Sequence, residues 1–236
     1  MTIAGSGDKV PAALDFATLF AANTHEIKNQ LFLLLNAVEQ ASREHWASEY
    51  PSARIALDGL KQGGTQISQR LTRLLALYRI SQGHYQLDIA YHGAAELLEE
   101  VLLEIQPLLG ARAVEMTVAS TDEVYGFFDR EMVRGILLNA VHNALNVAVR
   151  KISLNAAMED GYLCIRVADD GPGFPPQVLE TGMAQAKWNM GGGGTGLGLH
   201  FSATAAALHR NQGNSGFIRL SNEGALRGAV FSLYLP

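Results

Sequence analysis

Apolar residues in the first third of the chain recur at intervals of three and four, the spacing that places side chains on one face of an α-helix. This pattern predicts one helix over residues 13–46 and a second over residues 52–82. Between them, residues 49–52 contain a proline suited to a first helical turn and a serine that can cap it. The second helix has a heptad pattern, formed by Leu57, Leu60, Gly64, Ile67, Leu71, Leu74 and Tyr78.

Two long helices joined by a short loop form a hairpin, but their apolar stripes are too long to be buried against each other alone. We therefore predict that residues 13–82 form a homodimeric four-helix bundle. Gly63 and Gly64 interrupt the heptad pattern at a cost in helix propensity, so the helices either approach closely there or bend. Residues 1–12 are predicted to be a disordered lead, because they offer little to bury.

The pattern changes after residues 81–83, and we predict a second domain over residues 86–236. Its predicted helices cover residues 93–108, 130–149 and 196–210, and its predicted strands cover residues 86–90, 113–119, 124–128, 151–158, 161–168, 216–221 and 228–235. Turns are expected at Glu159-Asp160-Gly161 and at Asn222-Glu223-Gly224. Helices with a largely antiparallel sheet in this order predict a two-layer α/β sandwich, so the whole chain is expected to be an α+β protein.

Composition narrows the class of protein. The net charge is −5 and no run of Lys and Arg is interleaved with aromatic residues, which disfavours nucleic acid as the main partner. The single cysteine, Cys164, lies in a predicted half-buried strand, so we expect a core residue and neither a disulfide framework nor a cysteine-based zinc site. The longest apolar runs span only a few residues, and we expect no membrane segment and a cytoplasmic location.

The first glycine-rich segment, residues 169–173, follows the predicted strand 161–168. That strand delivers the Asp169 carboxylate to its end, where it can accept a hydrogen bond from an exocyclic amine such as that of adenine. Gly171 and Gly173 would keep the wall beside such a base free of side chains. Taken alone, the segment fits a plain Asp-Gly turn equally well.

The second glycine-rich segment contains Gly194, Thr195, Gly196, Leu197 and Gly198, directly before an amphipathic helix. Free N–H groups at a helix N-terminus face an anion, so we interpret this segment as a phosphate site. A flexible linker is the alternative, although linkers seldom run straight into such a helix.

Asn139 and Asn143 lie four residues apart on one face of the predicted helix 130–149. Amide side chains on an otherwise apolar helix need partners, and Mg²⁺ carried by nucleotide phosphates is one that prefers oxygen ligands. For this motif alone, capping or internal hydrogen bonding is the more common explanation.

In their order and spacing, the three segments resemble the asparagine box and the two glycine boxes of the Bergerat (GHKL) ATP-binding fold. Sensor histidine kinases, gyrase-type ATPases, MutL-type proteins and heat-shock chaperones share that fold. The resemblance covers roughly residues 86–236 and implies an ATP site in which Asn143 is the Mg²⁺ ligand, Asn139 supports the phosphate end and Asp169 reads adenine. The box glycines would be Gly171, Gly173, Gly194, Gly196 and Gly198.

The segment NTHEIKNQL on the first predicted helix resembles the phosphoacceptor box of histidine kinases. The resemblance implies that His25 accepts the phosphoryl group and that Glu26 takes up the imidazole proton or holds its tautomer. Asn29 matches a position that in related kinases helps to orient a water for dephosphorylating a response regulator. Without this context, a lone helical histidine is usually structural or merely exposed.

Together, these resemblances imply the catalytic core of a two-component histidine kinase. Such a homodimer uses Mg-ATP to phosphorylate His25 and passes the phosphoryl group to an Asp of a response regulator receiver domain. Phosphatase activity toward that regulator is a second expectation, which rests on Asn29. No sensor domain is recognised in the sequence. Either such a domain has been removed, or the signal is expected to come from a separate protein or from the bundle itself.

Two departures from the family pattern keep an alternative open. Three residues after Asn143 the family usually has Lys or another polar residue that reaches phosphate, and here that residue is Asn146. No phenylalanine box is recognisable between Phe174 and Gly191. The alternative is a non-catalytic phosphotransfer or scaffold protein with a decayed ATP site. A Bergerat ATPase or serine kinase without histidine chemistry is disfavoured by the His25 segment.

Overall fold

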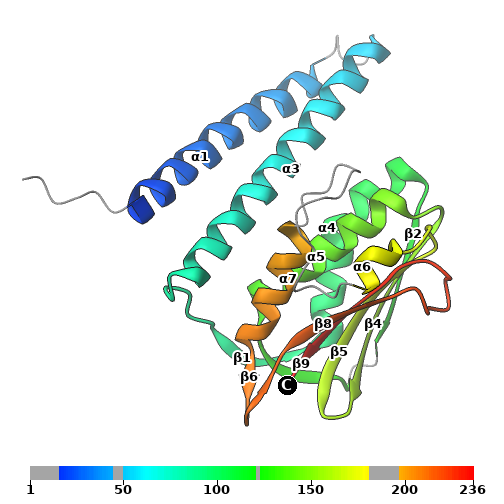
Figure 1. Ribbon diagram of the computed structural model, residues 1–236. Helices are drawn as coiled ribbons and strands as arrows, with labels where there is room; N and C mark the ends of the chain where they lie inside the picture. The colour runs from blue at the N-terminus through cyan, green and yellow to red at the C-terminus, as the bar shows by residue number, and fades with distance from the viewer. Residues whose placement is uncertain (1–15, 45–49, 121–122, 181–196) are drawn as a thin grey trace, which may run out of the picture. The chain divides into compact units, whose positions relative to one another are not determined.

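The computed structural model describes residues 16–44, 50–120, 123–180 and 197–236 (Figure 1). Contacts divide the chain into two compact units, Met1–Tyr78 and Arg79–Pro236, which are described separately. The predictions for residues 1–12 and for Gly194, Thr195 and Gly196 lie outside the described residues.

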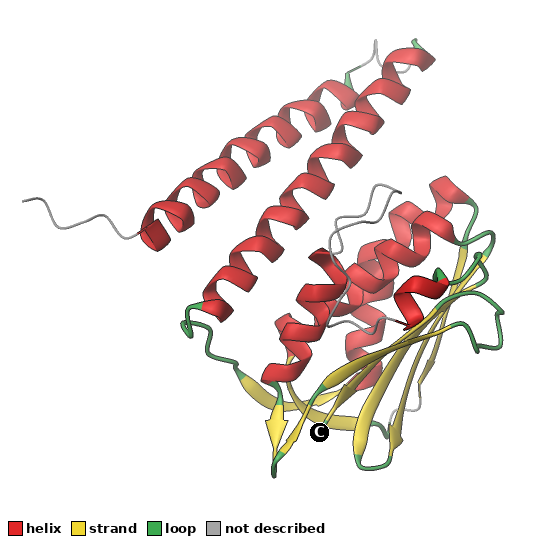
Figure 2. Cartoon of the chain, viewed as in Figure 1, coloured by secondary structure: helices red, strands yellow, loops and turns green. Residues whose placement is uncertain are grey.

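The first unit is a hairpin of two helices, α1 (Phe16–Arg43) and α3 (Pro51–Ser81) (Figure 2). The predicted helix over residues 13–46 is too long at its C-terminal end, since α1 stops at Arg43. In its last turn, Ser42 Oγ donates a hydrogen bond to the Val38 carbonyl at 2.8 Å, a local side-chain bond of the kind that weakens helices.

The two helices approach each other closely at Gly64. A Cβ atom added there would lie 2.6 Å from Leu35 Cδ2 and 3.6 Å from Leu31 Cδ1, whereas one added at Gly63 would have nothing within 4 Å. Close approach was one of two alternatives for this glycine pair, and it is confirmed for Gly64.

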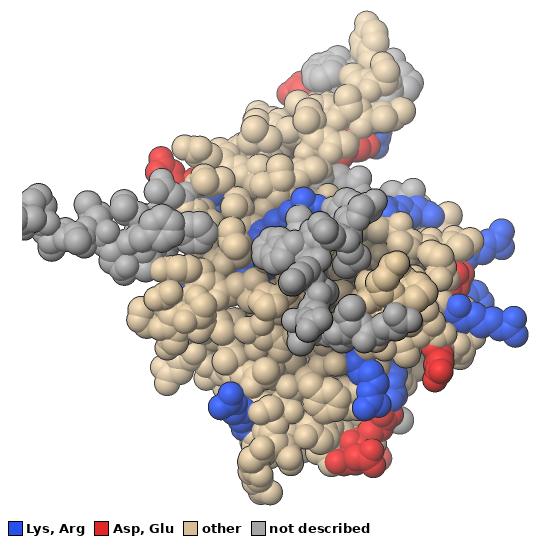
Figure 3. Space-filling view, viewed as in Figure 1, with Lys and Arg blue, Asp and Glu red and all other residues tan. Residues whose placement is uncertain are grey.

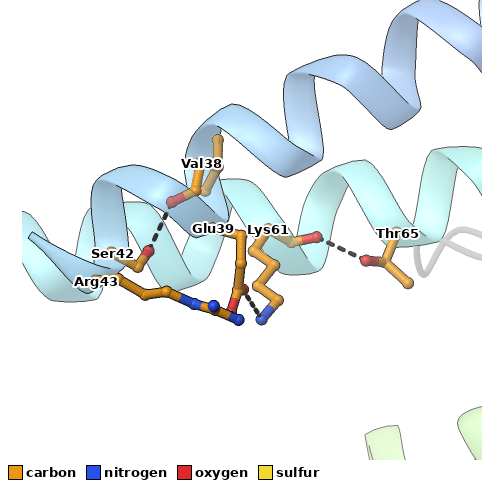
Figure 4. A network of polar contacts seen from close by, with 6 residues as sticks. All are labelled: Val38, Glu39, Ser42, Arg43, Lys61 and Thr65. Carbon is orange, nitrogen blue, oxygen red and sulfur yellow. Dashed lines mark hydrogen bonds and ion pairs between the residues drawn. The ribbon is translucent and has the colours of Figure 1, made fainter.

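A polar network also joins the helices (Figure 4). Glu39 on α1 accepts hydrogen bonds from Lys61 on α3 and from Arg43 at 3.2 Å, one turn along α1. The bonds from Lys61 and Arg43 lower the pKa of Glu39. Because these side chains are largely open to solvent, the network contributes little to stability.

Many large apolar side chains of the described hairpin remain exposed to solvent. They are Ile27, Phe32, Leu33, Leu34, Ile55, Leu60, Ile67 and Leu74. The hairpin therefore leaves much of its apolar surface unburied, and the homodimer stays a prediction that this exposure supports.

The second unit is a sheet with helices on one face (Figure 1). Its elements are β1 (Ile89–Gly93), α4 (Ala94–Arg112), β2 (Glu115–Ser120), β3 (Tyr125–Asp129), α5 (Arg130–Val147), β4 (Lys151–Glu159), β5 (Tyr162–Asp169), α6 (Pro176–Glu180), α7 (Leu197–Leu208), β6 (Arg210–Asn211), β7 (Asn214–Ser215), β8 (Phe217–Ser221) and β9 (Val230–Leu235). Five strands form the main sheet in the order β2-β4-β5-β9-β8, in which β2 and β4 are parallel and the other pairs antiparallel. The predicted α+β architecture with a two-layer sandwich is confirmed.

The core lies between this sheet and the helices α4, α5 and α7. Alternate residues of β5, such as Ile165 and Val167, point into it, and every residue of β9 is buried. From α5, Ile136 and Leu137 are fully buried, as the helical periodicity predicts. Cys164 is also fully buried, which confirms the prediction of a core cysteine.

One predicted strand boundary is wrong. The first strand is Ile89–Gly93 and not residues 86–90, because its pairing with β3 begins at Ile89 opposite Asp129. The Asp129 carboxylate meanwhile accepts a hydrogen bond from the Asp88 N–H at 3.0 Å. The segment Asn222-Glu223-Gly224 lies in the connection between β8 and β9, as predicted, and this connection spans residues 222–229 because Ser221 pairs with Val230.

The other hairpin turn is confirmed. Asp160 and Gly161 have φ angles of 49° and 83°, as a two-residue turn of the type favoured in hairpins requires. The sequence pattern does not predict the short helix α6 or the small hairpin of β6 and β7, whose turn has positive φ at Gln212 and Gly213. These elements are too short to show any periodicity.

Candidate functional site

Asp169 is the last residue of β5, and only 3% of its surface is exposed. Its Oδ1 accepts hydrogen bonds from the backbone N–H groups of Gly171 at 2.8 Å and Ala229 at 3.3 Å. Burial raises the pKa of Asp169, the two N–H groups oppose the rise, and the neighbouring Asp170 adds to it. No hydrogen bond among the described residues uses Oδ2, so this oxygen can accept one from a ligand.

Close packing around Asp169 explains two glycines. A Cβ at Gly171 would lie 2.6 Å from the Val147 carbonyl oxygen and 2.9 Å from Asp169 Oδ1. One at Gly228, in the connection before β9, would lie 2.3 Å from the Asp169 carbonyl oxygen and 2.6 Å from Oδ1. Gly171 is thus required by the fold itself, in addition to any base beside it. Gly228 and Ala229 were not predicted as site residues, because the hydrogen bond from Ala229 to Asp169 joins residues 60 positions apart in the sequence.

The next residues of the same segment are held by Asn222. Gly173 has a φ of 82°, and a Cβ there would lie 2.8 Å from the Asn222 side chain. Asn222 Oδ1 accepts a hydrogen bond from the Phe174 N–H at 2.7 Å, and its Nδ2 donates one to the Phe174 carbonyl at 3.0 Å. Asn222 is therefore a backbone clamp, a role that its position in a predicted turn did not reveal.

Asp170 ties this segment to the C-terminal end of α5. Its carboxylate accepts hydrogen bonds from the N–H groups of Val149 at 2.8 Å and Arg150 at 3.1 Å. Burial alone would raise the pKa of Asp170, but the hydrogen bonds from Arg150, Lys151 and Val149 outweigh it and lower the pKa. The chain just after α5 is consequently fixed beside Asp169.

Helix α5 carries the two predicted asparagines. The helix is capped by Asp129, whose Oδ1 accepts a hydrogen bond from the Met132 N–H at 2.8 Å. Asn139 is 1% exposed, whereas Asn143, one turn later, is exposed to solvent. Although four residues separate them, their surroundings differ, and only Asn143 has its side chain open to a ligand in solution.

Asn139 connects α5 to the start of α7. Its Nδ2 donates a hydrogen bond to Ser202 Oγ at 3.2 Å, and a Cβ at Gly198 would lie 2.4 Å from its Oδ1. Leu197 and Gly198 form the first turn of α7, so the described part of the second glycine segment packs directly on Asn139. Ser202 is a further residue that sequence analysis missed.

Asn146, the departure from the family pattern, is engaged by α4. Its Oδ1 accepts a hydrogen bond from Arg112 Nη1 at 3.1 Å, and the same nitrogen donates to the Leu145 carbonyl at 2.8 Å. Both asparagine and arginine are exposed, and the pair closes the last turn of α5.

The predicted phosphoacceptor segment lies within α1. His25 is part of that helix, and its side chain lies outside what the structure describes. Glu26 and Asn29 are exposed, while Thr24 is 4% exposed. The roles predicted for these residues and for the nucleotide-site residues stay predictions.

The surface charge, the possible metal ligands and the hydropathy of the helices can be judged over the described residues. On the face in Figure 3, the described Lys and Arg side chains form several separate groups, with Asp and Glu beside some of them. No group of three or more His, Cys, Asp and Glu residues that could hold a metal ion occurs among the described residues. Within the same residues, no helix has the length and apolar character needed to cross a membrane.

The chain is similar in sequence to proteins of known families. Residues 128–236 match the model of the histidine kinase-, DNA gyrase B-, and HSP90-like ATPases. The chain is 26% identical to the sensor histidine kinase RppB of Synechocystis over 92% of its own length and 48% of the relative's. It is 27% identical to the histidine protein kinase DivJ of Caulobacter vibrioides, over 75% of its own length and 30% of the relative's. The chain thus spans about half the length of these curated relatives, or less.

Two solved structures share the fold. Full-length ShkA in complex with AMPPNP gives a TM-score of 0.67 at 22% identity, over 92% of this chain and 45% of that one. The histidine kinase AdeS of Acinetobacter baumannii gives a TM-score of 0.59 at 16% identity, over 89% of this chain and 96% of that one.

Proposed function

We propose, on the premise that this chain is a sensor histidine kinase catalytic core with a Bergerat ATP-binding domain, that it uses Mg-ATP to phosphorylate its own His25 and then transfers the phosphoryl group to an Asp of a response regulator. The observation that carries the ATP site is Asp169, a buried carboxylate at a strand end with one oxygen fixed by two backbone N–H groups and the other free for a ligand.

In the proposed reaction, the residues of the ATP-binding domain bind and orient the nucleotide. Asp169 Oδ2 accepts a hydrogen bond from the adenine amine, and the free N–H groups at the start of α7 donate to phosphate oxygens. Asn143 is exposed, and its amide oxygen is a ligand of the kind that Mg²⁺ accepts, so this residue fits that ion. Bound Mg²⁺ would neutralise charge that develops on the phosphates.

The residues of α1 supply the acceptor. A neutral imidazole nitrogen of His25 attacks the γ-phosphorus in line, and the bond to the bridging oxygen of ADP breaks. Glu26, which is exposed next to it, takes up the proton that the imidazole loses. In a second, phosphatase reaction, Asn29 orients the water that dephosphorylates the response regulator.

The partners follow from the same proposal. The exposed apolar residues of α1 and α3 support a homodimer through residues 13–82. A response regulator receiver domain takes the phosphoryl group, and a separate sensor or input protein is a second proposed partner. Because the reaction consumes ATP, we place it in the cytoplasm.

The test is incubation of purified protein with γ-labelled ATP and Mg²⁺. Incorporated label is expected to be acid-labile, as a phosphoramidate is, and to disappear in His25→Gln. The matched control is His84→Gln, which removes an exposed histidine outside α1 and is expected to keep the label. Label that persists in His25→Gln would show that another residue is the acceptor.

The alternative function, a phosphotransfer or scaffold protein with a decayed ATP site, is favoured by one contact. Asn146 occupies the position from which the family usually reaches phosphate, and its side chain is engaged by Arg112 instead. If the alternative holds, the protein will incorporate no label from ATP but will accept a phosphoryl group on His25 from a phosphorylated receiver domain.

A further inference from the structure

Ser202 lies one turn into α7 and is fully buried beneath the first glycine of that helix. Its Oγ donates a hydrogen bond to the Gly198 carbonyl at 3.0 Å and accepts one from Asn139 Nδ2 at 3.2 Å. One hydroxyl group therefore links the backbone at the start of α7 to a side chain of α5.

Asn139 depends on that hydroxyl for its orientation. Its Oδ1 is buried and has no hydrogen-bond partner among the described residues. The same oxygen lies against Gly198, where an added Cβ would approach it to 2.4 Å. Because Oδ1 has no partner, the hydrogen bond from Nδ2 to Ser202 is the one among the described residues that fixes the rotation of the Asn139 amide. The orientation of this amide in turn limits how closely Gly198 of α7 can approach α5.

Asn139 is also too buried to be an ordinary ligand of a nucleotide in solution, because 1% of its surface is exposed. Its effect on a phosphate must therefore pass through the neighbouring turn of α7. The backbone N–H groups of that turn are the ones that face an anion in the proposed ATP site.

We propose that Ser202 is a positioning residue for phosphate recognition: it holds the Asn139 amide, and thereby the first turn of α7, in the arrangement that binds the phosphates of ATP. This inference rests on the proposed ATP site and deepens it. Ser202 has no role in recognising adenine, because Asp169 and the segments that hold it belong to other elements.

The test compares binding of ATP with binding of adenosine, which lacks phosphates. Dissociation constants of the full chain for both are measured by calorimetry, in the presence of Mg²⁺, for the wild type, Ser202→Ala and Ser202→Cys. Thr204→Ala is the matched control, because it removes a hydroxyl two residues further along the same helix. Thermal unfolding of each variant, measured in parallel, shows that it is folded.

Ser202→Ala is expected to weaken ATP binding about tenfold, the effect of one buried hydrogen bond, and to leave adenosine binding within about twofold. Ser202→Cys, with a weaker donor and acceptor, is expected to be intermediate, and it decides the question if the alanine variant does not fold. Equal weakening of ATP and adenosine, or weakening of neither, would overturn the inference while leaving the ATP site in place. Wild-type protein that binds no adenine nucleotide would overturn the proposed function itself.

Discussion

The substitution Asp169→Asn changes one oxygen of the candidate site into an NH₂ group and removes its charge. The remaining oxygen can still accept the hydrogen bonds from Gly171 and Ala229, so the local backbone has no reason to move. The new NH₂ group would face the adenine amine donor to donor. Since a charge-assisted hydrogen bond contributes roughly 1.5–3 kcal/mol, ATP binding should weaken about 10- to 150-fold.

The same substitution should not destabilise the domain without nucleotide. Burial raises the pKa of Asp169 above its ordinary value of 3.8, so the folded domain holds the ionised carboxylate less favourably than the unfolded chain does. Stability from this group is greatest when it is protonated, falls as the pH rises from 3.8 to the folded pKa, and stays reduced at neutral pH. The asparagine variant escapes this penalty, so at pH 7 it should unfold at the same temperature as the wild type or higher.

Calorimetric titration with ATP and thermal unfolding without it measure the two effects on one preparation. The matched control is Asp160→Asn, the same change in an exposed hairpin turn where φ is 49°, a conformation that asparagine tolerates. Unchanged ATP affinity in Asp169→Asn would refute the assignment of this carboxylate to adenine. A lower unfolding temperature would refute the reasoning about burial.

Three further outcomes are expected. His209 is buried and neutral, since its Nδ1 donates a hydrogen bond and its Nε2 accepts one. Burial lowers its pKa below 6.5, so the free energy of unfolding should fall as the pH drops below 6.5. Urea titrations from pH 7.5 to 5.5 should show a flatter dependence of this free energy on pH in His209→Gln than in the wild type. Gly63→Ala should stabilise α3 by up to about 1 kcal/mol, whereas Gly64→Ala should lose that gain because its methyl group meets Leu35; equal melting temperatures of the two variants would contradict the close approach. Asn146→Lys should tighten ATP binding by up to roughly fivefold, as an exposed charge pair contributes at most about 1 kcal/mol, and unchanged calorimetric affinity would show that this position does not reach phosphate.

The parts of the fold that could be predicted from sequence are those with a long periodic signal. The sequences of α1, α3 and α5 show such a signal over many turns, and the Asp160-Gly161 turn indicated the pairing of the strands β4 and β5. The elements that were missed or misplaced, α6 and the β6–β7 hairpin among them, are too short for a period and depend on tertiary contacts.

In the candidate site too, residues in local sequence motifs could be named, and residues that act through long-range contacts could not. Asp169 could be named as a candidate because it lies in a glycine-rich segment, and Asn143 because it follows Asn139 by four residues on one helix. Ser202 and Asn222 could not, since each acts on a residue 48 to 63 positions away and neither belongs to a recognisable motif. Gly171, which was assigned to the wall beside a base, also has a structural reason that sequence does not show, the approach of the Val147 carbonyl.

These long-range contacts separate the site into two parts with different supports. The Asp169 end is fixed by the connection before β9, through Ala229, and by the end of α5, through the carboxylate of Asp170. The α7 end is fixed to α5 by the bond between Asn139 and Ser202. Because the supports share no hydrogen bond, damage to one should leave the other intact. Asp169→Asn should therefore lower the affinities for ATP and adenosine together, whereas Ser202→Ala should lower that for ATP alone, and the two penalties on ATP should add in the double variant.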